Sequence, residues 1–273
     1  MDGGDLVRPD RRKAPRRLAL SGASPRFLAF ETPRTARVAV LGGPAEGTAE
    51  ETVEGTAEGA ARESWFVLHG YRQLAHRFLR RFEPVAGPEL RVVAPEGLSR
   101  FYLAPGDRPH GASDPVGASW MTREERGDEI RDYVRYLDGV AAHFGEIVGE
   151  EEGAAAPPSM PGAARVPSTV LGFSQGAHTA ARWVALGGVR PGRLVLWGAG
   201  LPGDLPPDAG ERLRGLDLVL VRGEGDGLRN VEEEAREEAF CRAEGIRPRI
   251  VTHPGGHEIA EAVLRGLRTP RPG

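Results

Sequence analysis

The 273-residue chain is 40% hydrophobic, which is enough for one sizeable core, and we expect one domain rather than two. Its net charge of −3 gives no electrostatic case for nucleic acid as a partner. The single cysteine, Cys241, excludes an intramolecular disulfide framework and a CxxC metal or redox site. No apolar run approaches the length of a membrane span, so we expect a soluble, cytoplasmic protein without stable membrane insertion.

Three segments have compositions that cannot build a core. Residues 1–24 are rich in arginine, and the apolar stretch after these arginines is too short and too interrupted for a signal sequence. We therefore expect a flexible basic tail, followed by a single domain over residues 25–268. Residues 42–61 and 149–167 are of low complexity and are expected to be loops, the second dispensable for folding.

Short apolar runs alternate with segments of helical periodicity along the rest of the chain. The runs predict strands buried on both faces, as in a parallel sheet, at residues 38–41, 65–68, 90–94, 169–173, 194–197, 216–221 and 249–251. Helices are predicted at residues 71–82, 122–144, 175–186, 229–243 and 258–267, with a T-x-x-E capping box from Thr122 to Glu125. This alternation predicts an α/β fold with a mostly parallel central sheet flanked by helices, whose ligands bind at the carboxyl ends of the strands.

The pentapeptide G-F-S-Q-G at residues 172–176 has the form G-x-S-x-G. A predicted strand precedes it and a predicted helix follows, which is the setting in which such a serine becomes a nucleophile. The outer glycines would remove clashes with the flanking strand and helix, so that the hydroxyl of Ser174 projects from a tight, strained turn.

A serine hydroxyl needs a base to take its proton and an acid to orient that base. Asp226 follows the predicted strand at 216–221 and is the preferred acid, with Glu224 as a competitor, whereas Asp217 begins that strand. His257 lies after two glycines and before a predicted helix, which makes it the preferred base. His253 is the alternative base, although a local backbone contact would also explain it.

Other histidines and glycines have simpler interpretations. His178 lies one helical turn after Ser174 and is expected to pack, and His76 and His143 are expected at the surface. The sequence at 198–203 matches G-x-G-x-x-G, but prolines interrupt the helix that a dinucleotide site requires. We interpret it as a loop that borders the site.

Two backbone N–H groups would stabilise the oxyanion of an acyl-transfer reaction. One is expected from Gln175, directly after the nucleophile. The other is expected from Tyr71, after the strand that ends in His69-Gly70.

The chain resembles the phospholipase/carboxylesterase family of α/β-hydrolases, which includes acyl-protein thioesterases, over about residues 65–267. The resemblance rests on H-G at 69–70, L-G-F-S-Q-G-A at 171–177, G-x-x-D at 223–226 and G-H-E at 256–258. It implies the α/β-hydrolase fold and a catalytic triad of Ser174, Asp226 and His257. Where the family has H-G-x-G-D, this chain has Arg72 and Gln73, which alters the floor of the loop.

The leading hypothesis is a serine hydrolase that cleaves carboxylic esters or thioesters of small molecules without a metal or cofactor. Trp120, with Met121 and Leu201, is expected to line an acyl site for short to medium chains, although Trp120 could equally be a packing residue. A binding protein without activity, or a peptidase or lactonase on the same fold, is the alternative. A homodimer is compatible with these expectations.

Overall fold

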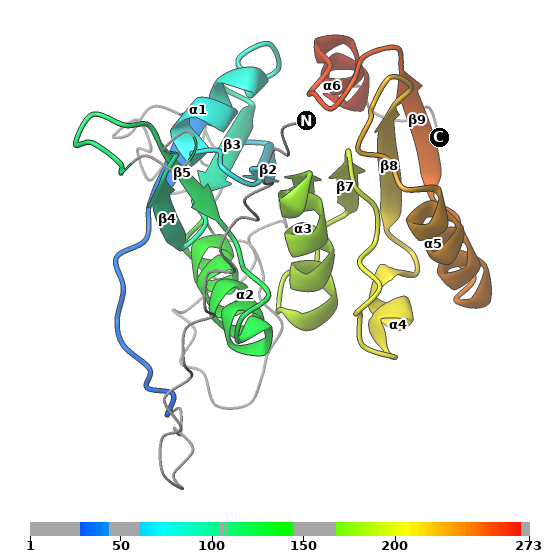
Figure 1. Ribbon diagram of the computed structural model, residues 1–273. Helices are drawn as coiled ribbons and strands as arrows, with labels where there is room; N and C mark the ends of the chain where they lie inside the picture. Colours follow the sequence, from blue (N-terminus) through cyan, green and yellow to red (C-terminus); the bar gives the residue numbers. More distant parts are fainter. Residues whose placement is uncertain (1–27, 44–60, 104–105, 107–108, 145–167, 269–273) are drawn as a thin grey trace, which may run out of the picture. The chain divides into compact units, whose positions relative to one another are not determined.

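The seven apolar runs form a single sheet with the order β1-β3-β2-β6-β7-β8-β9 (Figure 1). β1 runs antiparallel to β3 and every other neighbouring pair is parallel, which confirms the prediction of a mostly parallel sheet. The strands are β1 Val38–Gly42, β2 Glu63–Leu68, β3 Leu90–Pro95, β6 Ser168–Phe173, β7 Arg193–Trp197, β8 Asp217–Gly223 and β9 Arg249–His253.

This arrangement comes from a computed structural model that describes residues 28–43, 61–103, 106, 109–144 and 168–268. The chain divides into two units, Met1–Thr35 and Ala36–Gly273, and every element named here belongs to the second. The basic tail, its predicted boundary at residue 24 and nearly all of both low-complexity segments lie outside the described residues.

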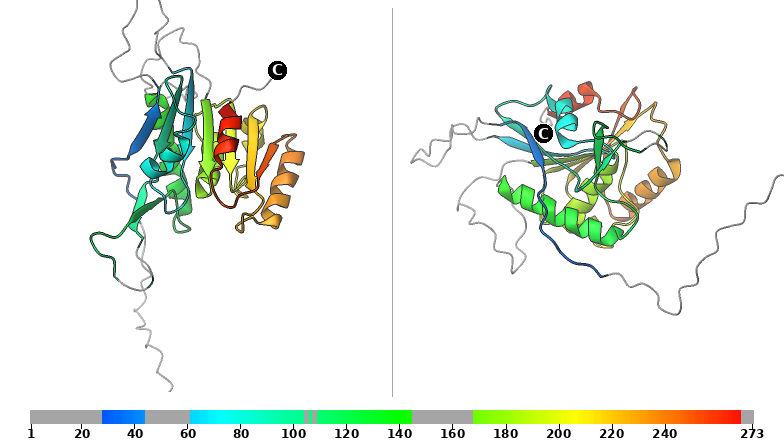
Figure 2. Two further views of the ribbon diagram at one scale, coloured as in Figure 1. Left: turned by 90° about the horizontal axis from the view of Figure 1, so that it is seen from above. Right: turned by 60° about the vertical axis from the view of Figure 1, so that its left-hand side comes forward.

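Helices cover both faces of the sheet (Figure 2). They are α1 Ala75–Leu79, the 3₁₀ turn η1 Arg80–Phe82, α2 Arg126–His143, α3 Gln175–Leu186, α4 Ala209–Leu213, α5 Val231–Ala243 and α6 Glu261–Arg268. A separate antiparallel hairpin of β4 Ser99–Tyr102 and β5 Val116–Ser119 completes the fold. None of the described helices is long and apolar enough to cross a membrane.

Alternation along β2 divides the core into two layers. Phe66 and Leu68 pack in a cluster with residues of α2 and α3, whereas Trp65 and Val67 pack in a second cluster with residues of α1 and α6. Successive side chains of a strand point to opposite faces, so an uninterrupted apolar run fills both layers. The central strands therefore form a buried platform that holds their ends in fixed positions. The edge strands β1 and β9 are partly exposed, because each has a neighbouring strand on one side alone, so the prediction of burial on both faces is wrong for these two.

Several boundaries differ from the predictions. α2 begins at Arg126 and not at Thr122, because Glu125 takes the left-handed conformation (φ 45°) and no side chain caps the helix. The hydroxyl of Thr122 instead accepts the N–H of Glu124 at 3.3 Å, so the predicted capping box is wrong. α1 begins only at Ala75, since the residues before it form a turn that is hydrogen-bonded to β5.

Candidate active site

Ser174 lies in the sharp turn between the end of β6 and the start of α3. Its backbone has φ 55° and ψ −121°, a strained conformation that a non-glycine residue rarely adopts. A Cβ at Gly172 would collide with the backbone of Gly176, and a Cβ at Gly176 would collide with the carbonyl of Leu68. The two glycines therefore allow the strand and the helix to approach closely around the serine.

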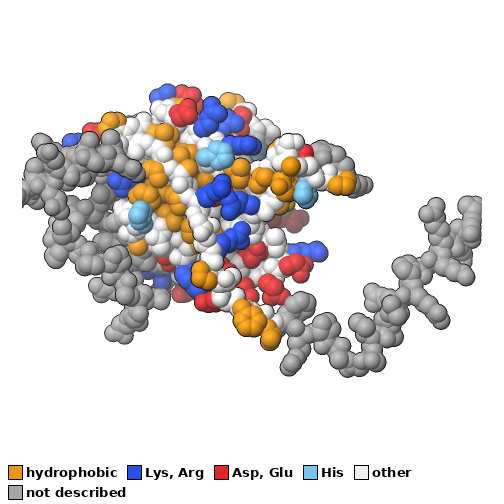
Figure 3. All heavy atoms as spheres, turned by 90° about the vertical axis from the view of Figure 1, so that its left-hand side faces the viewer, with side chains coloured by type: hydrophobic (Ala, Val, Ile, Leu, Met, Phe, Trp, Pro, Cys, Tyr) orange, Lys and Arg blue, Asp and Glu red, His pale blue; other side chains and the backbone are white. Residues whose placement is uncertain are grey.

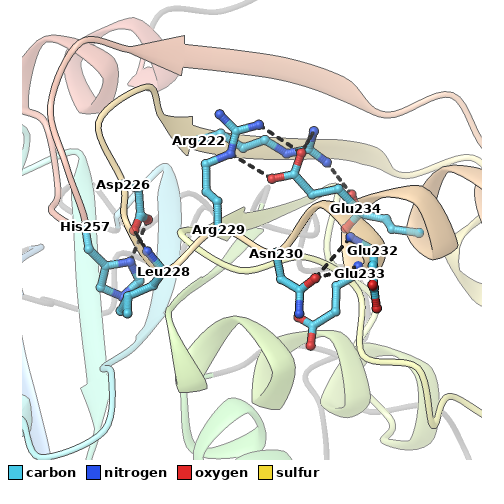
Figure 4. Close-up of polar contacts among 10 residues, drawn as sticks. Arg222, Asp226, Leu228, Arg229, Asn230, Glu232, Glu233, Glu234 and His257 are labelled. Atoms are coloured by element: carbon cyan, nitrogen blue, oxygen red, sulfur yellow. Dashed lines mark hydrogen bonds and ion pairs between the residues drawn. The ribbon is translucent and has the colours of Figure 1, made fainter.

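His257 and Asp226 are hydrogen-bonded at the same end of the sheet (Figure 4). Nδ1 of His257 lies 2.7 Å from Oδ2 of Asp226, and Oδ1 accepts the N–H of Leu228 at 2.8 Å. Burial opposes ionisation of Asp226, but the hydrogen bonds from His257 and Leu228 outweigh it, so its pKa is lowered. A carboxylate can only accept, so Nδ1 of a neutral His257 carries the proton and Nε2 has a free lone pair.

Nε2 of His257 is buried and, among the residues that the structure describes, has no hydrogen-bond partner. Its ring packs against Phe173, the neighbour of Ser174, with ring centroids 4.8 Å apart. Gly198 (φ 68°) makes room for this ring, because a Cβ there would lie 2.8 Å from Cε1 of His257. The role of Gly198 was not found from the sequence, since the contact exists only after folding.

The competing candidates are located elsewhere. Glu224 is exposed, and Asp217 is paired with Arg193 at the opposite end of β8. Nδ1 of His253 accepts the N–H of Gly255 at 3.2 Å, which is the local backbone contact that the sequence suggested. Among the candidate acids, Asp226 is the one whose printed contact in the described part of the chain is with a histidine side chain.

The loop after β2 leaves one backbone donor without a partner. The N–H of Gly70 donates to Oε1 of Gln73 at 2.8 Å, that of Arg72 to the carbonyl of Ala118, and that of Gln73 back to Gly70. Among the described residues no acceptor is found for the N–H of Tyr71, whose side chain is stacked on Phe101 and exposed. Gln175 opens α3, so its N–H also has no acceptor within the helix.

The side chain of Gln175 is hydrogen-bonded to the segment that precedes α2. Its Oε1 accepts the N–H of Trp120 at 3.1 Å, and its Nε2 donates to the carbonyl of Met121 at 2.9 Å. The indole N–H of Trp120 donates in turn to the carbonyl of His69 at 2.8 Å. This chain of hydrogen bonds links the residue after Ser174 to the loop that carries Tyr71.

A cavity of about 220 Å³ contains Ser174, Asp226 and His257 in its walls. Gly198, Ala199, Gly200 and Leu201 also line it, so the G-x-G-x-x-G segment borders the site as a loop. Trp120 and Met121 are not part of this lining. Trp120 is 2% exposed and belongs to the core, which is the packing role left open by the sequence, and Met121 is half-buried against the same core.

Charged side chains from β8 and α5 form another wall of this cavity (Figure 4). Arg222 contacts Glu237 at 2.6 Å and Glu234 at 3.1 Å, and Arg229 binds Glu234 through two of its nitrogens. Asn230 caps α5 by accepting the N–H groups of residues 232 and 233. This side of the cavity is therefore polar, and sequence periodicity alone gave no sign of it.

His178 also lines the cavity, whereas the sequence predicted only packing. Its pKa is lowered to about 4, first by burial and then by the nearby cations Arg182 and Arg126, although Asp204 opposes this shift. Arg182 is almost fully buried and is paired with Asp204 at 2.7 Å. His178 is thus uncharged at neutral pH and adds no positive charge to the cavity.

No cluster of histidine, cysteine, aspartate and glutamate side chains suited to a metal ion occurs among the described residues. Cys241 is buried in α5, and burial raises the pKa of its thiol to about 11.

No protein-family model matches the chain, and no curated protein matches it either. Solved structures do match. YahD with malic acid has a TM-score of 0.56 at 12% identity, over 86% of this chain and 97% of that one. Acyl-protein thioesterase 2 of Zea mays has a TM-score of 0.55 at 15% identity, over 85% and 98% of the two chains. A carboxylesterase from Mesorhizobium loti has a TM-score of 0.53 at 18% identity, over 77% and 88%.

The chain has the α/β-hydrolase fold. In this fold a nucleophile elbow follows a central parallel strand, and the acid and the histidine come later in the chain. The order β6–Ser174, β8–Asp226, β9–His257 follows that scheme. The fold predicted from the sequence is thereby confirmed.

Proposed function

We propose that this protein is a serine hydrolase of the phospholipase/carboxylesterase family that cleaves carboxylic esters or thioesters. The observation that carries the proposal is the His257–Asp226 hydrogen bond, with Nε2 of His257 unpartnered among the described residues and with Ser174 and His257 in the walls of one cavity. Structural neighbours that are esterases and thioesterases support the same class of reaction.

The first half of the reaction forms an acyl-enzyme. Nε2 of His257 takes the proton of the Ser174 hydroxyl as its oxygen attacks the acyl carbonyl. The N–H groups of Tyr71, in the loop after β2, and of Gln175, at the start of α3, stabilise the oxyanion, since neither has an acceptor among the described residues. Ionised Asp226 stabilises the imidazolium that forms, and His257 then protonates the leaving alcohol or thiol.

The second half repeats these steps with water. His257 takes a proton from water, the hydroxide attacks the acyl carbonyl, and the carboxylic acid leaves as Ser174 regains its proton. The same two backbone donors stabilise the second tetrahedral intermediate. No step requires a metal or a cofactor.

A fluorophosphonate probe tests the proposal, because it reacts only with an activated serine. The full chain is expected to be labelled and the Ser174→Ala variant is not, while Ser99→Ala, which changes a serine of β4 outside the cavity lining, keeps its labelling. Hydrolysis of p-nitrophenyl acetate and of an acyl thioester then measures turnover. Equal labelling of the Ser174→Ala variant would show that the assignment is wrong.

A further inference from the structure

A second cavity, of about 280 Å³, lies beside His257 and carries an excess of positive charge. His257 lines both this cavity and the one that contains Ser174. Its lining includes Arg72, Arg77, Arg81, Phe173, His257 and Glu258. Three guanidinium groups thus face a single carboxylate, that of Glu258.

The three arginines come from adjoining parts of the chain. Arg72 lies in the loop after β2, Arg77 in α1, and Arg81 in the 3₁₀ turn that continues it. A separation of four residues brings Arg77 and Arg81 to one side of this helical segment. Figure 3 shows one face of the molecule on which arginine side chains lie across the middle and near the top, with acidic side chains in its lower part and at the top.

None of these three guanidinium groups forms an ion pair with another described residue. Arg80, between them in sequence, is paired with Glu83 at 3.7 Å and does not line the cavity. Unpaired guanidinium groups that converge on a cavity suit a carboxylate or phosphate, whose oxygens accept two parallel N–H bonds from one arginine. The cavity is therefore complementary to an anion.

The position of Arg72 is fixed before any ligand arrives. Its N–H donates to the carbonyl of Ala118 at 2.9 Å, and the N–H of Ala118 donates to the carbonyl of Gln73 at 3.0 Å. Its backbone lies in the left-handed region (φ 69°), which a residue other than glycine adopts only where the surrounding structure holds it there. β5 thus holds the start of this side chain at the mouth of the cavity.

We propose that the arginine-lined cavity binds an anionic group, a carboxylate or a phosphate, on the leaving alcohol of the substrate. The proposal rests on the proposed function, because His257 must reach the leaving oxygen to protonate it. The alcohol therefore passes His257, and the cavity of Arg72, Arg77 and Arg81 begins there. The preferred substrate class is an ester whose alcohol part carries a negative charge.

A matched pair of esters tests the proposal. 4-Acetoxybenzoate has an anionic leaving group, and its methyl ester is neutral with the same scaffold. We expect Arg77→Gln and Arg81→Gln each to lower the ratio of kcat/KM for the anionic to the neutral ester by about two- to fivefold, since exposed charge pairs contribute modestly. Intrinsic reactivities of the two esters cancel in this comparison between variants. Arg80→Gln is the matched control and is expected to leave both rates unchanged.

The acyl side provides a further control. p-Nitrophenyl hemisuccinate carries its negative charge on the acyl part, and p-nitrophenyl butyrate is its neutral counterpart. Arg77→Gln and Arg81→Gln are expected to leave the ratio of kcat/KM for the hemisuccinate to that for the butyrate unchanged. The proposal would be overturned if the arginine variants lowered the anionic-to-neutral ratio of kcat/KM for the hemisuccinate pair alone. It would also be overturned if Arg80→Gln lowered the ratio for the acetoxybenzoate pair as much as they do.

A binding measurement separates this proposal from the proposed function. Calorimetry with the Ser174→Ala variant measures binding of 4-hydroxybenzoate, phenyl phosphate and neutral 4-hydroxybenzamide without turnover. We expect both anions to bind more tightly than the amide, more weakly at high salt, and more weakly when Arg77→Gln is added. Whichever of the two anions binds more tightly shows whether the cavity prefers a carboxylate or a phosphate. If neither anion binds better than the amide, the proposal fails even when ester hydrolysis is observed.

Discussion

Asp226 and His257 lie 31 positions apart in the chain, yet Oδ2 of the first is 2.7 Å from Nδ1 of the second. The contact exists because β8 and β9 are parallel neighbours, with Gly223 paired with His253, so that the loops after the two strands meet. The N–H of Gly225 also donates to the carbonyl of Gly255 at 3.0 Å and ties these loops together. The pairing of two strands thus brings an acid to a base.

Replacement of Asp226 by asparagine is predicted to lower kcat by about ten-thousand-fold, the effect of a wrong histidine tautomer in a serine-protease triad. The amide would present a donor to Nδ1 and leave the proton on Nε2. Glu224→Gln is the matched control and is expected to keep its activity, because Glu224 is exposed. Initial rates with p-nitrophenyl acetate measure both variants. A greater loss with Glu224→Gln would reverse the assignment of the acid.

The side chain of Gln175 is predicted to support catalysis indirectly, through its hydrogen bonds to Trp120 and Met121. Gln175→Ala removes the acceptor of the Trp120 N–H and the donor to Met121, and an unsatisfied buried group costs about 1–3 kcal/mol. We expect a lower melting temperature and a fall in kcat larger than the change in KM.

Gln175→Glu is the comparison variant, because it keeps an acceptor for Trp120 and loses the donor to Met121. It should recover part of the lost stability. An unchanged kcat in Gln175→Ala would show that this hydrogen-bond chain does not position the oxyanion donors.

Local sequence was sufficient where the structure is local. Gly172, Ser174 and Gly176 define the turn within five residues, and the apolar runs of the parallel strands are continuous. Asp226 and His257 could be selected because strand ends of a parallel sheet meet at one edge. These inferences require only the pattern and the topology.

Contacts between distant segments could not be predicted in the same way. The bond from the Trp120 indole to the carbonyl of His69 joins residues 51 positions apart, and no local pattern marks it. Thr122 and Glu125 match a capping box, but the left-handed backbone of Glu125 delays the helix until Arg126. β4 and β5 are four residues long and pair only with each other, so their apolar patterns are too short to identify.

Stability is predicted to depend on pH through His178. Its folded pKa of about 4 lies below the ordinary value of 6.5, so the unfolded chain takes up the proton first as pH falls. The free energy of unfolding is unaffected by this proton above pH 6.5. It falls between pH 6.5 and 4, by roughly 3 kcal/mol at most, as the unfolded chain is protonated. His178→Gln should therefore show less loss of unfolding free energy than the parent chain over this window.

Urea titrations at pH 7.5 and 4.5 measure that difference. The exposed His76 provides the control, since His76→Gln is expected to keep the pH dependence of the parent chain. Asp226, whose pKa is lowered in the folded state, also destabilises the fold at acid pH, but it is present in all three proteins. Identical pH dependence in His178→Gln and the parent would contradict a buried neutral histidine.

The acyl chain is predicted to be short to medium, and Leu201 is predicted to limit its length. The cavity at Ser174 has about 220 Å³, below the roughly 300–1,000 Å³ of pockets for drug-sized ligands, and Leu201 lines it. p-Nitrophenyl esters from acetate to palmitate measure the preference. The activity of the wild type should be highest with a chain shorter than palmitate, and Leu201→Ala should shift the optimum toward longer chains.

Trp120→Ala removes a buried core side chain and is expected to cost about 3–5 kcal/mol of stability. A change of chain-length preference in Trp120→Ala, with none in Leu201→Ala, would instead assign the acyl wall to Trp120.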